Sequence, residues 1–152
     1  MRYPIITAEE AADFVFNGAN VGFSGFTACG TPKAIPVALA QKAKKEHEAG
    51  REFKINLFSG ASTNDFVDGE LARANAVNKR TPYQGCPDAR KAINAGAIEY
   101  FDLHLSELAQ KLRYNTFGQI DIAILEVQSI DDEGNAVLGT GIGNSPTFAL
   151  LA

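Results

Sequence analysis

One local pattern, repeated along the chain, most constrains the fold: a short alternating apolar stretch, a loop of small residues, and then a helical stretch. It occurs from residue 20 to residue 48 and again from residue 52 to residue 75. Strands that alternate with helices in this way form parallel sheets, because each crossover helix returns the chain to the same end of the sheet. The pattern predicts an α/β domain with a mainly parallel sheet, flanking helices and right-handed connections.

The expected helices and strands follow from apolar periodicity and from their start and stop signals. Helices are expected over residues 8–17, 36–48, 65–75, 88–95 and 106–114, and strands over residues 20–24, 52–58, 98–101 and 121–127, with a less regular extended piece at 80–83. Thr7 and Glu10 have the spacing of a capping box, which fixes the start of the first helix. The stretch 121–127 is the most apolar, which is typical of a central strand covered on both faces.

The final part of the chain has its own turn signals. Residues 131–135 are expected to form a hairpin turn into a strand at 136–138, and a glycine loop at 139–145 opens onto Pro146, a residue favoured at the first position of a helix. Only six residues follow Pro146, too few for a stable helix. We expect residues 1–152 to form one α/β domain and to be the front half of a larger protein.

Charge and composition argue against several classes of function. Eighteen Asp and Glu against fourteen Lys and Arg give a net charge of −4, so nucleic acid and anionic membranes are not expected as partners. No apolar run approaches the roughly 20 residues of a membrane-spanning helix, and the N-terminus lacks the order of a secretion signal. A cytosolic protein is therefore expected, with Cys29 and Cys86 reduced and with no disulfide framework or metal site.

Three glycine-containing loops are the candidates for a binding site. In an open parallel sheet, ligands bind beyond the carboxyl ends of the strands, where the free N–H groups of helix N-termini attract anions. The loops at residues 25–32, 59–64 and 139–145 lie at such positions and combine small residues with hydroxyl or amide side chains. They suit a carboxylate, a thioester carbonyl or a phosphate, although glycines can also serve only to make tight turns.

The known phosphate-binding motifs are not matched. Residues 25–30 have the glycine spacing of a P-loop, but Thr31 and Pro32 stand where Lys and Ser or Thr are needed. Residues 139–143 read GTGIG, which is not the dinucleotide-binding pattern of glycines. Nucleotide hydrolysis and a nicotinamide cofactor are both disfavoured.

Three single residues could carry chemistry, and each has a plainer alternative. Cys29 precedes a helix and could be a nucleophile, but no His or Asp lies nearby in sequence to activate it, so a bystander role is expected. His104 could be a base, although a histidine just before a helix more often caps or packs. Glu126 ends the most apolar strand, so its carboxylate is expected to face either the crevice or, preferably, a hydrogen-bonded position behind it.

Six motifs together carry a resemblance to a known family. They are GFSGFTACGTPK (residues 22–33), IP (35–36), SGAS (59–62), RKAINAG (90–96), HLS (104–106) and GNS (143–145). In this order and spacing they resemble the acetyl-CoA hydrolase/transferase family, which includes acetate, propionate, succinate and butyrate CoA-transferases. The resemblance covers nearly the whole chain, and this chain is similar to the N-terminal domain alone.

The resemblance implies a CoA-transferase type of α/β domain that faces a second, similar domain across the active site. It also implies a ping-pong transfer in which a glutamate of the C-terminal domain becomes a glutamyl-CoA thioester. No catalytic residue is therefore assigned in this chain. The implied partners are an acyl-CoA, a short-chain carboxylate, the C-terminal domain and, at full length, a second subunit, with coenzyme A as a substrate and no tightly bound cofactor.

The same resemblance implies which residues bind substrate. Ser62 is similar to a family position that contributes to the acyl or carboxylate pocket, where a hydroxyl can donate to a carboxylate oxygen. The implied walls of the crevice are Gly25, Phe26, Thr27, Gly30, Gly60, Ala61, Gly143, Asn144 and Ser145. Two alternatives stay open: hydrolysis of the acyl-CoA by water, and a non-catalytic domain that senses a small anion at the same loops.

Overall fold

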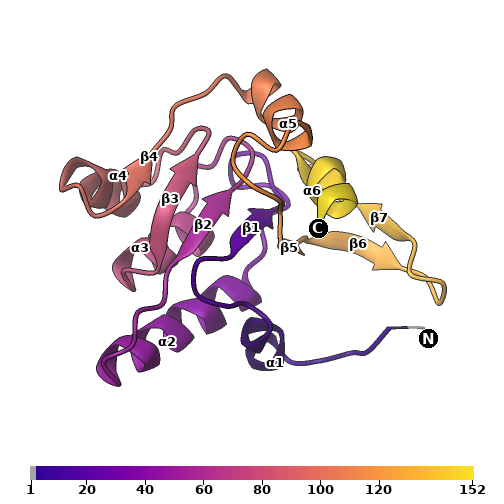
Figure 1. The fold of residues 1–152 in the computed structure, drawn as a ribbon. Helices are drawn as coiled ribbons and strands as arrows, with labels where there is room; N and C mark the ends of the chain where they lie inside the picture. The colour runs from indigo at the N-terminus through magenta and orange to yellow at the C-terminus, as the bar shows by residue number, and fades with distance from the viewer. Residues whose placement is uncertain (1–2) are drawn as a thin grey trace.

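A parallel five-stranded sheet organises the chain, whose computed structural model describes residues 3–152. The strand order is β4-β3-β2-β1-β5 (Figure 1). The strands are β1 (Asn20–Phe23), β2 (Ile55–Phe58), β3 (Val77–Thr81), β4 (Glu99–Tyr100) and β5 (Ile122–Ile124). Val21 pairs with Leu57 on one side and with Ile122 on the other, and every pairing in this sheet is parallel. The expected α/β fold with a parallel sheet is confirmed.

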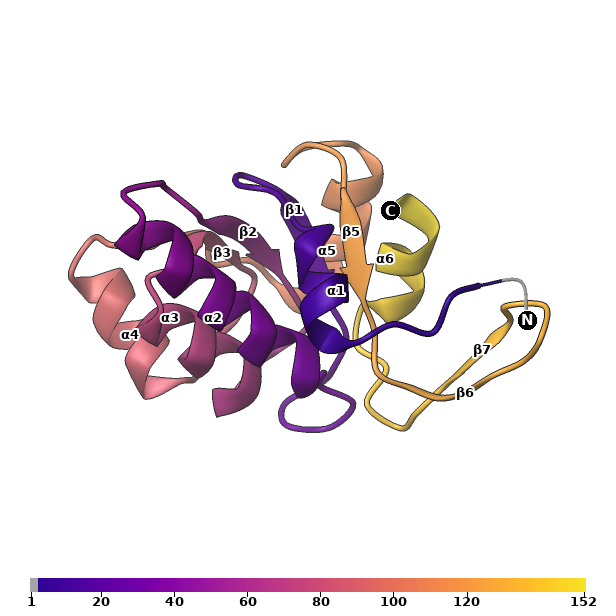
Figure 2. The same cartoon turned by 90° about the horizontal axis from the view of Figure 1, so that it is seen from below.

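Helices cover both faces of the sheet, as Figure 2 shows. One face carries α1 (Ala8–Asp13), α2 (Ala34–Glu48), the π-helical turn η1 (Asp65–Gly69), α3 (Glu70–Arg73) and α4 (Pro87–Asn94). The other face carries α5 (Leu105–Arg113) and α6 (Ser145–Leu151). Two apolar cores result, a larger one beneath α1 to α4 and a smaller one beneath α5 and α6. None of the helices within residues 3–152 is long and apolar enough to cross a membrane.

Helix α1 begins as its sequence predicts and ends earlier. The capping box is present, with the Glu10 amide donating to Thr7 Oγ1 at 3.1 Å and the Thr7 amide donating to Glu10 Oε2 at 2.8 Å. The helix ends at Asp13 rather than at residue 17. Lys42 Nζ binds the carbonyl oxygens of Ala12 at 3.0 Å and Val15 at 2.8 Å, so a side chain from α2 takes the place of a further helical turn.

Strand β5 corrects one expectation about position. Its faces are packed as predicted, with Ile122 and Ile124 in the larger core and Ala123 and Leu125 against the smaller one. It lies at the edge of the sheet formed by residues 3–152, however, and not in its centre. The prediction of a central strand was wrong because apolar residues report what packs on the two faces of a strand, not whether its edge is paired.

Two further segments differ in detail from the sequence reading. The helix expected at residues 65–75 begins as the π-helical turn η1, and its first N–H groups are capped by Asn64, whose Oδ1 accepts from the Val67 amide at 3.1 Å. Of the extended piece expected at 80–83, residues 80 and 81 are the end of β3, which begins at Val77. Its early residues, Asn78 and Lys79, are exposed and polar, so they gave no strand signal.

The expected hairpin is present, and the residues around Pro146, expected to be too few for a stable helix, form α6 (Ser145–Leu151). Strands β6 (Val127–Ile130) and β7 (Ala136–Leu138) pair antiparallel and extend away from the sheet (Figure 1). Pro146 lies in the first turn of α6, as predicted. The fully buried ring of Phe148 holds this short helix against β1, where a Cβ on Gly22 would lie 2.5 Å from Phe148 Cγ. Because Gly22 has no side chain, it leaves room for Phe148 of α6 to pack against β1.

Candidate functional site

The three predicted loops meet at the carboxyl ends of the central strands. The Thr27 amide donates to the Ala61 carbonyl at 2.6 Å, which joins the first loop to the second. The Gly25 carbonyl oxygen lies against Gly60 of the second loop and against Gly143 of the third. The structure thus brings together segments that are separated by more than thirty residues in the sequence.

Glycine is required where these loops touch. A Cβ on Gly60 would lie 2.7 Å from the Gly25 carbonyl oxygen, and a Cβ on Gly143 would meet the same atom. Gly25, Gly30 and Gly143 also have positive φ angles of 119°, 67° and 53°, which residues with a Cβ rarely adopt. These glycines make tight turns and also let the loops approach closely enough to form one site.

A small cavity of about 280 Å³ opens between the loops and the start of α5. It is lined by Phe26, Gly60, Ala61, Leu105, Ser106, Gly143 and Asn144. Five of these residues come from the loops predicted to form the crevice. Leu105 and Ser106 were not predicted as lining residues, although their HLS motif contributed to the resemblance. Reasoning from the ends of strands does not predict that a helix on the opposite face of the sheet packs against these loops.

The other predicted wall residues are not among those that line the cavity. Gly25, Thr27 and Gly30 shape the first loop, and Thr27 has a positive φ of 56°. Ser145 is buried, and its hydroxyl donates to the Ile142 carbonyl within the third loop. Substrate contact by these four residues stays a prediction.

The Ser62 hydroxyl lies in a buried hydrogen-bond network. It donates to Asp68 Oδ2 and accepts from Asn64 Nδ2 at 3.0 Å. Asn64 Nδ2 also lies 3.2 Å from the Thr27 carbonyl and 3.3 Å from Thr31 Oγ1, so the network links the second loop to the first. The predicted donation from Ser62 to a substrate carboxylate stays a prediction, and it requires the hydroxyl to leave Asp68.

A buried ion pair lies beneath this network. Asp68 of η1 and Arg80 of β3 are each only 1% exposed, and Arg80 Nε donates to Asp68 Oδ1 at 2.6 Å. Arg80 also donates to the carbonyls of Thr81 at 2.6 Å and Tyr83 at 3.1 Å, so all three of its guanidinium nitrogens have hydrogen-bond partners. The sequence did not predict this pair, because one Asp and one Arg twelve residues apart match no known motif.

The three single-residue candidates lie outside the cavity lining. Cys29 is exposed, and in the described part of the chain the hydrogen-bond partner of its sulfur is the hydroxyl of Thr140, at 3.2 Å. His104 occupies the position before α5 but is exposed and makes no capping bond, so the expectation that it caps or packs was wrong. The Glu126 carboxylate pairs with Lys33, which is the hydrogen-bonded placement preferred from the sequence.

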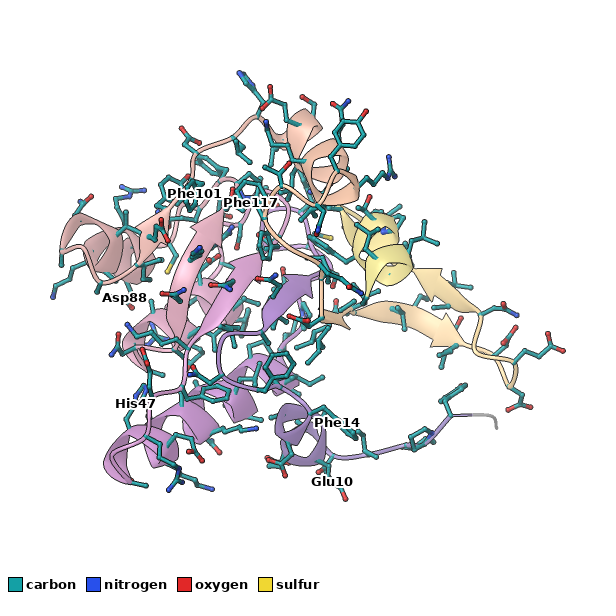
Figure 3. All side chains as sticks on the ribbon, viewed as in Figure 1. Glu10, Phe14, His47, Asp88, Phe101 and Phe117 are labelled. Carbon is teal, nitrogen blue, oxygen red and sulfur yellow. The ribbon has the colours of Figure 1, made fainter. Side chains whose placement is uncertain are left out.

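A larger cavity of about 390 Å³ lies on the α5 side of β2 and β3. Phe101 and Phe117 form part of its wall. Figure 3 shows the two side chains close together. Their ring centroids are 5.8 Å apart. Its one charged lining residue in the described chain is Lys79, whose Nζ lies 3.7 Å from Glu99. Across residues 3–152, no cluster of His, Cys, Asp and Glu is placed to hold a metal ion.

Comparison with known proteins decides the family. The model of the acetyl-CoA hydrolase/transferase N-terminal domain matches residues 2–152. The chain belongs to this family. The resemblance drawn from the six motifs is therefore confirmed, and so is its assignment to the N-terminal domain.

Members of the acetyl-CoA hydrolase/transferase family with named activities are similar to this chain. A propanoyl-CoA:succinate CoA transferase of Escherichia coli (strain K12) is 46% identical over 97% of this chain and 30% of its own length. A succinyl-CoA:acetate CoA-transferase of Clostridium kluyveri is also 46% identical, over 97% of this chain and 27% of its own length. An acetyl-CoA hydrolase of Saccharomyces cerevisiae is 38% identical over 95% of this chain. The chain thus spans about 30% of the length of these relatives.

A solved structure supports the fold. RipA from Yersinia pestis superimposes with a TM-score of 0.71 over 97% of this chain and 34% of its own, at 22% sequence identity. At this identity the likeness concerns the fold alone. It agrees with the parallel sheet and two helical layers seen in Figure 2.

Proposed function

We propose that this chain supplies one half of a CoA-transferase active site and binds the short acyl group or carboxylate there. The reacting glutamate belongs to the C-terminal domain of the longer protein. Its carboxylate attacks the acyl-CoA and releases the CoA thiolate, which attacks the resulting anhydride at the glutamyl carbonyl. The acyl group leaves as a carboxylate. The acceptor carboxylate then attacks the glutamyl-CoA thioester and releases the CoA thiolate, which attacks the acceptor's carbonyl in the new anhydride, so that the product acyl-CoA forms and the glutamate carboxylate is regenerated.

The observation that carries this proposal is the meeting of the three loops around one small cavity. The cavity lies at the carboxyl ends of parallel strands, where ligands bind in open α/β sheets. All seven of its lining residues belong to motifs that carry the family resemblance. The start of α5 adds backbone N–H groups suited to an anion.

Hydrolysis of an acyl-CoA is the second candidate, because a 38% identical relative is an acetyl-CoA hydrolase. The two reactions differ in whether water or a carboxylate attacks the thioester. That choice depends on how the facing domain excludes water. The role proposed for this chain is the same in both reactions.

The test uses a protein that carries this chain together with the C-terminal domain. It is incubated with acetyl-CoA, succinyl-CoA or butyryl-CoA, with and without a carboxylate acceptor, while exchange and free CoA are followed. Acceptor-dependent exchange supports the transferase, and acceptor-independent release of CoA supports the hydrolase. Binding of small anions without either reaction would support the non-catalytic sensor and contradict the proposal.

The proposal also includes a cytosolic location and a dimer at full length. Both cysteines are free thiols, which fits a reducing compartment. The dimer rests on the family resemblance. Gel filtration of the full-length protein with light scattering tests it.

A further inference from the structure

We propose that Asp68 is a positioning residue that controls how tightly this site holds a carboxylate, because it competes with the substrate for the single proton of the Ser62 hydroxyl. This inference rests on the proposed function and on the predicted contact between Ser62 and the substrate carboxylate. Asp68 acts through Ser62 and does not touch the substrate. The main consequence is that a neutral residue of the same shape at position 68 should tighten carboxylate binding instead of weakening it.

The single proton of the Ser62 hydroxyl already has an acceptor. The hydroxyl donates to Asp68 Oδ2, and its oxygen accepts from Asn64 Nδ2 at 3.0 Å. A hydroxyl has one proton to donate, and an ionised carboxylate can only accept. A substrate carboxylate therefore gains a hydrogen bond from Ser62 only when the proton turns away from Asp68.

The Asp68 carboxylate is a strong competitor for this proton. Its side chain is 1% exposed, and its Oδ1 accepts from Arg80 Nε at 2.6 Å. Hydrogen bonds to an ionised acceptor are roughly twice as strong as those between neutral groups. The substrate offers the same kind of acceptor, so exchanging one carboxylate for the other yields little free energy. The site therefore holds its carboxylate loosely.

Arg80 makes this exchange possible. When the proton turns away, Asp68 Oδ2 loses a donor, and a buried oxygen without a partner is costly. Arg80 Nη2 lies 3.4 Å from this oxygen, which is longer than the usual hydrogen-bond distance of about 2.7–3.2 Å. A small movement of the guanidinium brings Nη2 into hydrogen-bond range of the oxygen that Ser62 releases.

The backbone of Ser62 is fixed on both sides, so the hydroxyl proton is the part that changes partner. The Ser62 amide donates to the Tyr83 carbonyl at 3.1 Å, and the Ser62 carbonyl accepts from the Gly85 amide at 2.7 Å. Asn64 also anchors the loop, because its side chain caps η1. A change at Asp68 that keeps its shape should therefore act through the Ser62 proton and not through a displaced loop.

Loose binding of a carboxylate suits a transfer reaction. Each cycle releases one carboxylate and takes up another. Binding that is equally strong in the ground state and the transition state lowers KM without raising kcat. Competition from Asp68 limits the affinity for free carboxylates, so the released carboxylate leaves and the acceptor takes its place.

The central experiment is Asp68→Asn in a protein that carries this chain together with the C-terminal domain. The new amide oxygen still accepts from Arg80, while the new NH2 group can only donate to Ser62, which frees the Ser62 proton for the substrate. We expect the dissociation constant of acetate, measured from the broadening of its methyl NMR signal, to fall about three- to ten-fold. KM for acetate as acceptor should fall with it, while kcat should not rise.

Two double variants separate the proton from the charge, and a single variant is the control. Asp68→Asn with Arg80→Gln removes both charges, so no uncompensated guanidinium stays buried, and acetate binding should tighten by a similar factor. Asp68→Asn with Ser62→Ala removes the proton itself, and most of the gain should disappear. Asp65→Asn should leave acetate binding unchanged, because Asp65 lies in the same turn but pairs with Arg73 in a more exposed position. Circular dichroism shows which variants are folded.

The outcomes separate this inference from the function on which it rests. If Ser62→Ala weakens acetate binding but Asp68→Asn and the neutral double variant do not tighten it, Ser62 meets the substrate and Asp68 does not compete for its proton. The inference is then wrong. If Ser62→Ala also leaves acetate binding unchanged, Ser62 lies outside the site and the inference fails with it. Acceptor-dependent exchange by the unmodified protein tests the proposed function separately, and only its absence would count against that function.

Discussion

Arg80 Nε donates to Asp68 Oδ1 at 2.6 Å in an ion pair whose two side chains are each 1% exposed. The pair joins β3 to the π-helical turn η1 and lies directly beneath the Ser62 hydroxyl. A π-helical turn is frequent at functional sites, and here it carries the carboxylate that holds the second loop in place. The ion pair therefore links β3 and η1, through Ser62, to the loop that also carries the lining residues Gly60 and Ala61.

Removing one partner of this pair should be strongly destabilising. Arg80→Leu leaves the Asp68 carboxylate buried without a cation, and we expect a loss of about 3–5 kcal/mol in the free energy of unfolding. Urea denaturation followed by circular dichroism measures it. The double variant Asp68→Leu, Arg80→Leu should lose less than Arg80→Leu alone, and a larger loss in the double variant would show that the charge is not what matters.

Adding a methyl group at Gly22 should displace α6. A Cβ there would lie 2.5 Å from Phe148 Cγ, and the strand backbone cannot move away without breaking its pairing with β2 and β5. For Gly22→Ala we expect a loss of about 1–3 kcal/mol and faster hydrogen exchange in residues 145–151. Gly139→Ala is the matched control, because nothing lies within 4 Å of its added methyl. Equal exchange in both variants would contradict the packing of Phe148 on β1.

Acid should weaken the contact between Asp65 and Arg73. Hydrogen bonds from Arg73, at 2.7 and 3.0 Å, hold the pKa of the Asp65 carboxyl below its usual value. A carboxyl whose folded pKa is lowered stabilises the fold above its unfolded pKa of about 3.9, and this stability is lost as the pH falls through the folded pKa.

The measurement is the urea midpoint between pH 7 and pH 2, in the unmodified chain and in Arg73→Leu. We expect the variant to lose less stability on acidification, because its Asp65 carboxyl titrates at nearly its usual pKa. Arg90→Leu is the control, since Arg90 is exposed and makes no ion pair within residues 3–152. The same acid dependence in the unmodified chain and in Arg73→Leu would rule out the contribution of this contact.

Ser62→Ala separates substrate binding from loop support. If Ser62 donates to the substrate carboxylate, the variant loses one charge-assisted hydrogen bond of about 1.5–3 kcal/mol, so turnover of the full-length protein with acetate should fall about ten-fold or more. The structure adds an expected loss of about 1 kcal/mol in stability, because Asp68 loses a donor. Unchanged kinetics together with lower stability would leave Ser62 as a support for the loop only.

Much of the fold follows from local signals in the sequence. The capping box of Thr7 and Glu10, the alternation of apolar residues in β1 and β2, and Pro146 at the start of α6 each act within a few residues. Such signals predict where an element begins and which type it is. They do not predict that α1 ends early, because Lys42 binds its last carbonyls from a helix thirty residues away.

The site was predictable as a set of loops but not as a set of contacts. Three glycine-containing loops at strand ends indicated where a ligand could bind, and Gly60 and Gly143 do lie together beside Gly25. The presence of Leu105 in the cavity depends on how α5 crosses the opposite face of the sheet, and the burial of Arg80 depends on η1. Both are long-range packing results that no single stretch of sequence contains.

The location of the nucleophile tests the account most directly. The 152-residue chain is purified alone and incubated with acetyl-CoA or butyryl-CoA plus a carboxylate acceptor, and borohydride is then added to reduce any thioester bound to the protein. We predict no exchange and no modified residue by mass spectrometry, because the proposed function assigns the reacting glutamate to the C-terminal domain. A protein carrying both domains should show both. Turnover by the chain alone, or a modified residue within it such as Glu126, would contradict the account.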